Sequence, residues 1–229
     1  MNWLVPWEPS LIVCIATAVA TAFWLRKQGQ EKLFFGLGIA VIYFALQTHF
    51  DYFAEHSFLM HRVQQALLHH IGPFLLVLGG ARLRCFGPLV NTLLFCGLTL
   101  LWLFPHVHAI AMLDWRVYRL MNWGMVIDGL MFWTLALEAR GALAGRMGML
   151  LATIPFQVAL GALLFFTPRE LYPIYEICGR AFDNLSPLID QQLGALVIWL
   201  CGPMMSTIAL LLIMKREGLM FQREIYGTR

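Results

Sequence analysis

Charged residues are scarce in this chain of 229 residues. They make up 13% of it, whereas hydrophobic residues make up 60% and the mean hydropathy is +0.71. A soluble domain carries about a quarter charged residues, so the composition excludes an ordinary soluble globular protein. The sequence predicts an all-α, polytopic membrane protein in which residues 1–229 form a single helical domain embedded in the lipid bilayer.

The chain also lacks the short motifs that mark many enzymes and nucleic-acid-binding proteins. It contains no P-loop, no GxGxxG, no HExxH and no visible Ser/His/Asp arrangement. Its five cysteines form no CxxC pair and no disulfide framework, and Cys178 stands alone in a loop. The sequence therefore predicts neither an enzyme nor a nucleic-acid partner. No basic stretch precedes the first apolar segment, so we expect that segment to be retained and not cleaved as a signal peptide.

Long apolar runs are abundant. The hydrocarbon core of a bilayer is about 30 Å thick and takes about 20 apolar residues to cross as a helix. Seven segments reach or approach that length: 9–25, 33–51, 59–79, 88–104, 117–137, 147–166 and 190–214. We therefore expect about seven transmembrane helices.

Basic residues are unevenly divided between the two sides of this arrangement. With alternate loops assigned to opposite sides, 11 of the 16 Lys and Arg residues fall on one side and five, Arg62 among them, on the other. The side with few basic residues also carries eight acidic ones. The positive-inside rule then places the N-terminus outside and the C-terminus inside.

A row of polar residues leads into the third apolar segment. On an α-helix one face would carry Met60, His61, Gln64, Gln65 and His69. His70 would point away from that face. Because polar side chains are costly in lipid, the row should face other helices or a wet cavity. It is either a metal or ligand site open to one membrane face, or a set of hydrogen bonds between helices.

All seven histidines lie in the outer half of the predicted bundle or near its middle. His49 ends the second segment, His56 leads into the third, and His106 and His108 lie between the fourth and fifth. Imidazole is a common copper ligand, and the thioether of Met favours Cu(I). The position of His106 and His108 is typical of interfacial residues. The predicted copper ligands are His61, Met60, His69, His49 and His56.

Further polar residues are expected to surround such a site. Asp128 is a carboxylate deep inside a predicted span, so it should be protonated or paired with Asn122 or with the Gln and His residues of the third segment. The last span opens on Asp190 and Gln191, after a loop of about 23 residues that lies along the outer membrane surface or docks a partner. The expected polar neighbours are Gln64, Gln65, Asp128, Asn122, Asp190 and Gln191.

Two stretches resemble the CtaG-type cytochrome c oxidase assembly proteins. The first is HRVQQALL at residues 61–68, followed by Pro73 and LLVLGG; the second is DQQLGALVIW at residues 190–199, followed by Gly202. A weaker match is GLMFW at residues 129–133. The resemblance implies a multi-pass protein of a bacterial inner membrane, a metallochaperone that assists copper insertion into a respiratory oxidase at the outer face. Its implied partners are an oxidase subunit and a periplasmic copper chaperone.

This chain departs from the family pattern at several positions. The family usually has His where Gln65 stands and Met where Arg62 stands, and often has His near the start of the fifth span, where this chain offers Tyr118 and Asn122. Amides are poor copper ligands compared with imidazole. One alternative is therefore a metal-free scaffold or docking partner of an oxidase subunit. Other classes are a small membrane transporter and a haem- or quinone-linked protein, although no other span offers a deep histidine to pair with His69 around a haem.

Overall fold

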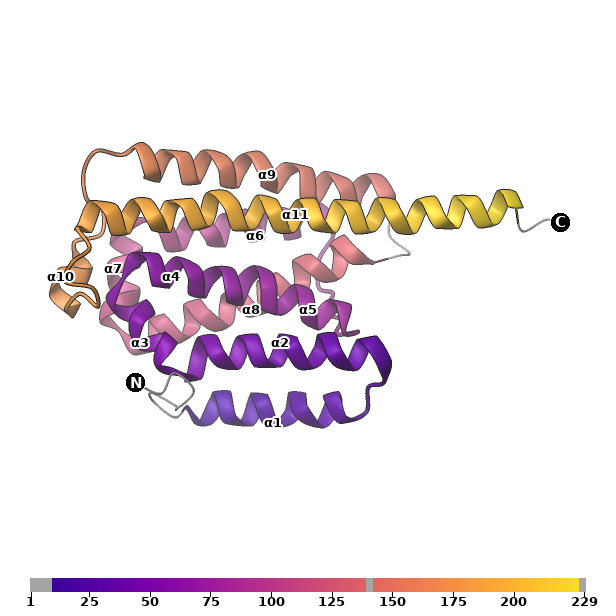
Figure 1. Cartoon of the computed structure of the whole chain (residues 1–229), viewed down its shortest axis with the longest axis horizontal. Helices are drawn as coiled ribbons and strands as arrows, with labels where there is room; N and C mark the ends of the chain where they lie inside the picture. The colour runs from indigo at the N-terminus through magenta and orange to yellow at the C-terminus, as the bar shows by residue number, and fades with distance from the viewer. Residues whose placement is uncertain (1–9, 139–141, 227–229) are drawn as a thin grey trace.

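The computed structural model describes residues 10–138 and 142–226, which form long helices packed side by side (Figure 1). The third rod is α4 (Phe58–Gln65), which continues through the π-helical segment η1 (Ala66–Ile71) into α5 (Gly72–Leu78). The other long helices are α1 (Leu11–Leu25), α2 (Gly29–Gln47), α6 (Pro88–Leu103), α8 (Trp115–Leu137), α9 (Leu143–Phe166) and α11 (Pro187–Tyr226). No strand occurs in the described residues.

Three short helices gather at one end of the bundle, which we call the capped end (Figure 1). They are α3 (His49–His56), α7 (Pro105–Leu113) and α10 (Ile174–Cys178). α7 is bent away from α6 by 75° at Phe104, because Pro105 favours an extended preceding residue and has no N–H to continue the helix. α7 therefore lies at the end of the bundle and not along it.

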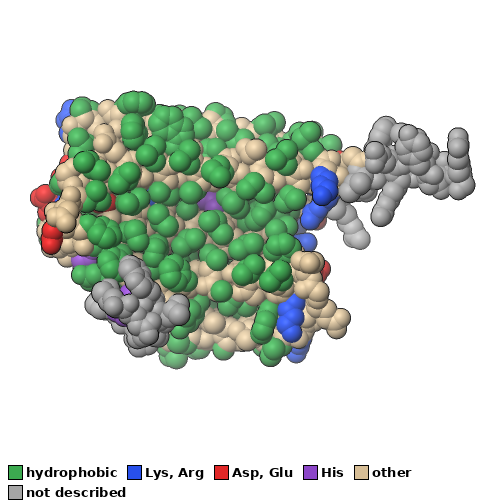
Figure 2. All heavy atoms as spheres, viewed as in Figure 1, with side chains coloured by type: hydrophobic (Ala, Val, Ile, Leu, Met, Phe, Trp, Pro, Cys, Tyr) green, Lys and Arg blue, Asp and Glu red, His purple; other side chains and the backbone are tan. Residues whose placement is uncertain are grey.

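Four helices, α2, α8, α9 and α11, are long and apolar enough to cross a membrane, and α6 with α7 makes up to five. α1 is apolar but only 15 residues long. Figure 2 shows a broad hydrophobic band between acidic side chains at the capped end and Lys and Arg side chains mostly at the other end. The prediction of an all-α, multi-pass membrane protein is thus confirmed, with four to five candidate spans.

The third rod is not the regular α-helix that the sequence predicted. Pro73 has no N–H, and its ring clashes with the carbonyl four residues earlier, that of His69. The turn before it widens into the π-helical segment η1, and Trp133 Nε1 donates to the freed His69 carbonyl at 3.2 Å. The wider turn changes the direction in which the following side chains point. His70 is therefore buried beside His69, with 5.2 Å between ring centroids, and the prediction that it points away was wrong.

Three boundaries also differ from the prediction. Thr48 is extended and its side chain accepts from Phe50 N, so α2 ends at Gln47, and His49 and Asp51 belong to α3. The last helix begins at Pro187 and runs to Tyr226, well beyond the expected segment 190–214.

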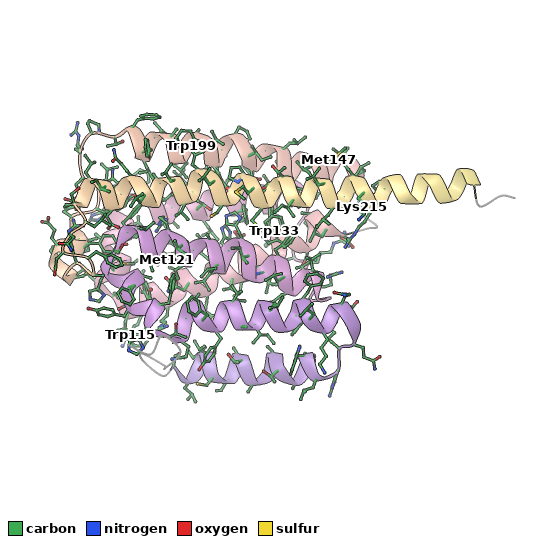
Figure 3. The ribbon with its side chains drawn as sticks, in the orientation of Figure 1. Trp115, Met121, Trp133, Met147, Trp199 and Lys215 are labelled. Atoms are coloured by element: carbon green, nitrogen blue, oxygen red, sulfur yellow. The ribbon has the colours of Figure 1, made fainter. Side chains whose placement is uncertain are left out.

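The loop before the last helix folds over the capped end. Tyr172 and Tyr175 are buried, and the Tyr172 hydroxyl donates to the Leu103 carbonyl at 2.7 Å. Tyr172 also stacks on Phe58, with ring centroids 4.1 Å apart. These rings form one apolar cluster at the capped end. Another apolar cluster lies deeper in the bundle and includes Trp133, which Figure 3 labels. The loop therefore closes the bundle over the start of α4.

Candidate functional site

His61 and His108 meet at the capped end. His61 comes from the first turns of α4 and His108 from α7, and both are 0% exposed. Their ring centroids are 4.9 Å apart and their planes are nearly perpendicular. Phe58 packs edge-on against His108, and the ring of Tyr118 lies 6.1 Å from that of His61. An imidazole pair is thus enclosed by aromatic rings.

The two imidazoles differ in their hydrogen bonds. His108 Nδ1 lies 3.1 Å from the Trp102 carbonyl, which only accepts, so this nitrogen carries the proton. Its Nε2 then accepts from the Tyr175 hydroxyl at 2.8 Å. Burial, together with the neighbouring Arg62 guanidinium, lowers the pKa of His108 to about 3, so the ring is neutral near pH 7. His61 interacts with the Ala54 backbone, but neither of its ring nitrogens reaches the distance and angle of a full hydrogen bond.

Asp190 holds the start of α4 in place. Its carboxylate accepts from Ser57 Oγ at 2.7 Å, from Phe58 N at 2.8 Å and from Leu59 N at 3.0 Å. A helix N-terminus leaves its first N–H groups without partners inside the helix, and here a residue of α11 satisfies two of them. Asp190 therefore fixes the position of the turn that carries His61.

A buried network joins α3, the third rod and α8 beside the histidine pair. Gln64 Nε2 donates to Asp51 Oδ1 at 2.6 Å, and the Tyr118 hydroxyl lies 2.8 Å from the same oxygen. Arg119 forms an ion pair with the other oxygen of Asp51 at 3.2 Å. These contacts satisfy the Gln64 amide through neighbouring helices, as the hydrogen-bonding alternative for the polar row predicts.

Deeper along the same seam, two further pairs connect the third rod to α8. Gln65 Nε2 donates to Asn122 Oδ1 at 3.1 Å. His69 Nε2 lies 2.8 Å from Asp128 Oδ2, and both side chains are buried. Asp128 thus pairs with a histidine of the third rod, one of the partners expected for it. The close approach depends on Gly129, because a Cβ there would lie 2.4 Å from the His69 carbonyl oxygen.

The remaining predicted residues lie apart from the histidine pair or serve structural contacts. His56 Nδ1 bonds to the Tyr52 carbonyl at 2.7 Å, and His49 is half-buried in α3. Met60 is half-buried on α4. Gln191 accepts from Leu171 N at 2.7 Å and so holds the loop before α11 in place. Within residues 10–138 and 142–226, no three side chains of His, Cys, Asp or Glu come together as a metal-ion site.

Sequence reasoning missed the participants that come from loops. It treated His108 as interfacial and placed Arg62 among the loop charges, whereas both are buried at the capped end. It did not single out Tyr175, which reaches His108 only because the loop folds inward, or Gln157, which is buried in α9. Gln157 could have been found, because a glutamine inside the apolar segment 147–166 indicates a buried polar contact. Nothing in the sequence indicated that Tyr175 contacts His108.

The fold and these contacts define a multi-pass helical membrane protein with a buried imidazole pair at one end of its bundle. The family model described as cytochrome c oxidase caa3 assembly factor (Caa3_CtaG) matches residues 17–87 and 81–217. The chain belongs to this family, as its motifs indicated, and membership implies an oxidase-related partner. None of the curated proteins or solved structures compared with it matches.

Proposed function

We propose that this protein assists the maturation of a haem–copper oxidase by holding copper at His61 and passing it to an oxidase subunit. The observation that carries the proposal is the pair of unpartnered nitrogens on the buried His61 ring, in a chain that belongs to an oxidase assembly family. Copper is the cargo of this process, and the protein acts by binding and transfer without catalysing a reaction.

The chemistry around His61 supports a soft monovalent ion. Neutral imidazole nitrogen donates readily to Cu(I), and thioether sulfur is a matching ligand. Met60 lies next to His61 on α4 but does not face it, so its side chain would have to turn toward the ion to serve as a second ligand. His108 has a lone pair on Nε2, which Tyr175 now occupies. Binding by His108 therefore requires the Tyr175 hydroxyl to turn away. His49, His56 and His69 remain candidate ligands, with the Asp128 contact competing for His69.

The orientation that suits this function places the capped end outside a bacterial inner membrane. Seven crossings, with the N-terminus outside and the C-terminus inside, would be made by α1, α2, the third rod, α6, α8, α9 and α11. The segregation of acidic and basic side chains in Figure 2 supports this arrangement through the positive-inside rule. A periplasmic copper chaperone would then deliver copper at the capped end.

The cellular test replaces His61 by alanine in the native host and measures copper and haem in the purified oxidase. We expect oxidase copper to fall to the level found without the protein, because His61 offers the unpartnered nitrogens. His106→Ala is the matched control, since His106 is an exposed histidine of α7. If His61→Ala cells assemble copper-replete oxidase at wild-type levels, His61 does not hold the cargo.

A further inference from the structure

A small polar cavity lies inside the bundle, and Arg62, which neighbours the histidine pair, forms part of its wall. Its volume is about 30 Å³, and residues of the third rod, α6, α8, α9 and α11 line it. Polar or sulfur-containing side chains on its wall are Arg62, Gln65, His69, His70, Thr99, Met125, Gln157 and Cys201. Figure 2 shows histidine within the otherwise hydrophobic face, at the seam between α11 and the third rod.

Arg62 brings a positive charge to this cavity without a matching negative one. Its side chain is 2% exposed, and Nε and Nη2 have no hydrogen-bond partner. No carboxylate of the described residues forms an ion pair with it, whereas Arg119, Arg146 and Arg180 are all paired. The ring of Phe58, 5.0 Å from the guanidinium carbon, provides a cation–π contact only. Guanidinium stays protonated in proteins, and a buried charge requires a counter-charge.

The cavity wall contains further polar groups without partners. His70 Nδ1, Gln157 Oε1 and Gln65 Oε1 are buried and form no hydrogen bond. Gln157 can lie there because residue 202 is glycine; a Cβ at that position would fall 1.2 Å from Gln157 Oε1. Unpaired donors and acceptors around one void are the usual signature of a bound solvent molecule or ion.

The volume limits what can bind. About 30 Å³ holds on the order of two water-sized particles, which excludes a nucleotide, a haem or a quinone ring. A single small anion with one water fits, and it supplies the counter-charge that the protein lacks. Its polar partners would be the Nε and Nη2 groups of Arg62, with the water bridging to His70 or Gln157.

We propose that this cavity binds a small anion, a halide or a single carboxylate group, as the counter-ion of Arg62. The site lies between the helices that carry the copper-assembly motifs, but the inference does not depend on copper. Bound anion stabilises the bundle by joining α4 to α9 and α11. Removing it leaves an uncompensated charge buried in the protein, which is costly.

The test follows the unfolding temperature of the detergent-purified full chain while chloride or formate replaces gluconate at constant ionic strength and pH. Gluconate is too large for the cavity. We expect a saturable rise, about 5 °C or more at a hundred-fold excess over the dissociation constant. A rise with chloride alone identifies a halide site, and a rise with formate alone a carboxylate site.

Arg62→Met removes the charge and should abolish the rise, whereas Arg84→Met, at an exposed arginine, should leave it intact. Gln157→Leu keeps the charge and is expected to weaken the anion's apparent affinity, which keeps the test decisive if Arg62→Met does not fold. Chloride NMR line width on wild type and Gln157→Leu measures binding directly. An unfolding temperature indifferent to both anions, or an equal rise in Arg62→Met, would mean that the cavity holds water only.

Discussion

Replacing Gly129 by alanine is expected to lower the unfolding temperature of the purified protein by about 5–10 °C, the shift that about 2–3 kcal/mol gives in a chain of this size. The new Cβ would lie 2.4 Å from the His69 carbonyl oxygen and 2.9 Å from Pro73 Cγ. His69 belongs to the widened turn of the third rod and Pro73 to the start of α5 directly after it, where the backbone is held by packing. α8 must therefore move away, and the contacts of His69 with Trp133 and Asp128 loosen together.

Gly124→Ala is the matched control for this substitution. Gly124 lies on the same helix, and a Cβ there meets nothing within 4 Å. Alanine favours a helix over glycine by about 0.5–1 kcal/mol, so Gly124→Ala should leave the unfolding temperature unchanged or raise it slightly. Equal unfolding temperatures for the two variants would show that α8 and the third rod do not meet as closely as the structure places them.

Removal of the Asp190 carboxylate is the second change with a large expected effect. Asp190→Ala takes away the acceptor for Ser57 Oγ, Phe58 N and Leu59 N, all at 3.0 Å or less. A buried donor left without an acceptor costs about 1–3 kcal/mol, so we expect a loss of about 3–5 kcal/mol, measured as the free energy of unfolding in denaturant. The start of α4 would loosen, and with it the position of His61.

Two comparisons make the Asp190 experiment specific. Asp183→Ala removes an exposed acidic residue from the preceding loop and should be close to neutral. The double variant Asp190→Ala/Ser57→Ala should lose less free energy of unfolding than the two single variants added together, because each single change removes the same hydrogen bond. Strict additivity of the two free-energy changes would contradict the hydrogen bond between Ser57 at the start of α4 and Asp190 of α11.

Much of this arrangement was predictable from the sequence. The scarcity of charge indicated a membrane bundle, and the polar residues of the third rod had to face other helices or a wet cavity. Asp128, as a carboxylate inside an apolar span, had to be protonated or paired, with Asn122 and the histidines and glutamines of that rod as candidate partners. The structure pairs it with His69. The family resemblance rested on residues that the structure places at helix contacts, with Asp190 at the start of α4 and Gly129 against His69.

The rest depended on contacts between distant parts of the chain. The π-helical turn results from the ring of Pro73 acting on the backbone one turn earlier, and Trp133 of another helix satisfies the freed carbonyl. The pairing of His61 with His108 requires α7 to bend across the bundle end and the loop before α11 to fold over it. Periodicity within one segment carries no information on either event, because both depend on which helices become neighbours.

Copper binding at His61 is the central claim, and the most direct measurement is the copper content of purified protein after anaerobic Cu(I) loading. Wild type should retain close to one copper per chain, His106→Ala should match it, and His61→Ala should lose most of it. His69→Ala distinguishes the capped end from the deeper pair with Asp128, and it should retain copper if His61 is the principal ligand. Wild-type protein that emerges without copper would contradict the account and leave a metal-free scaffold for the oxidase as the function.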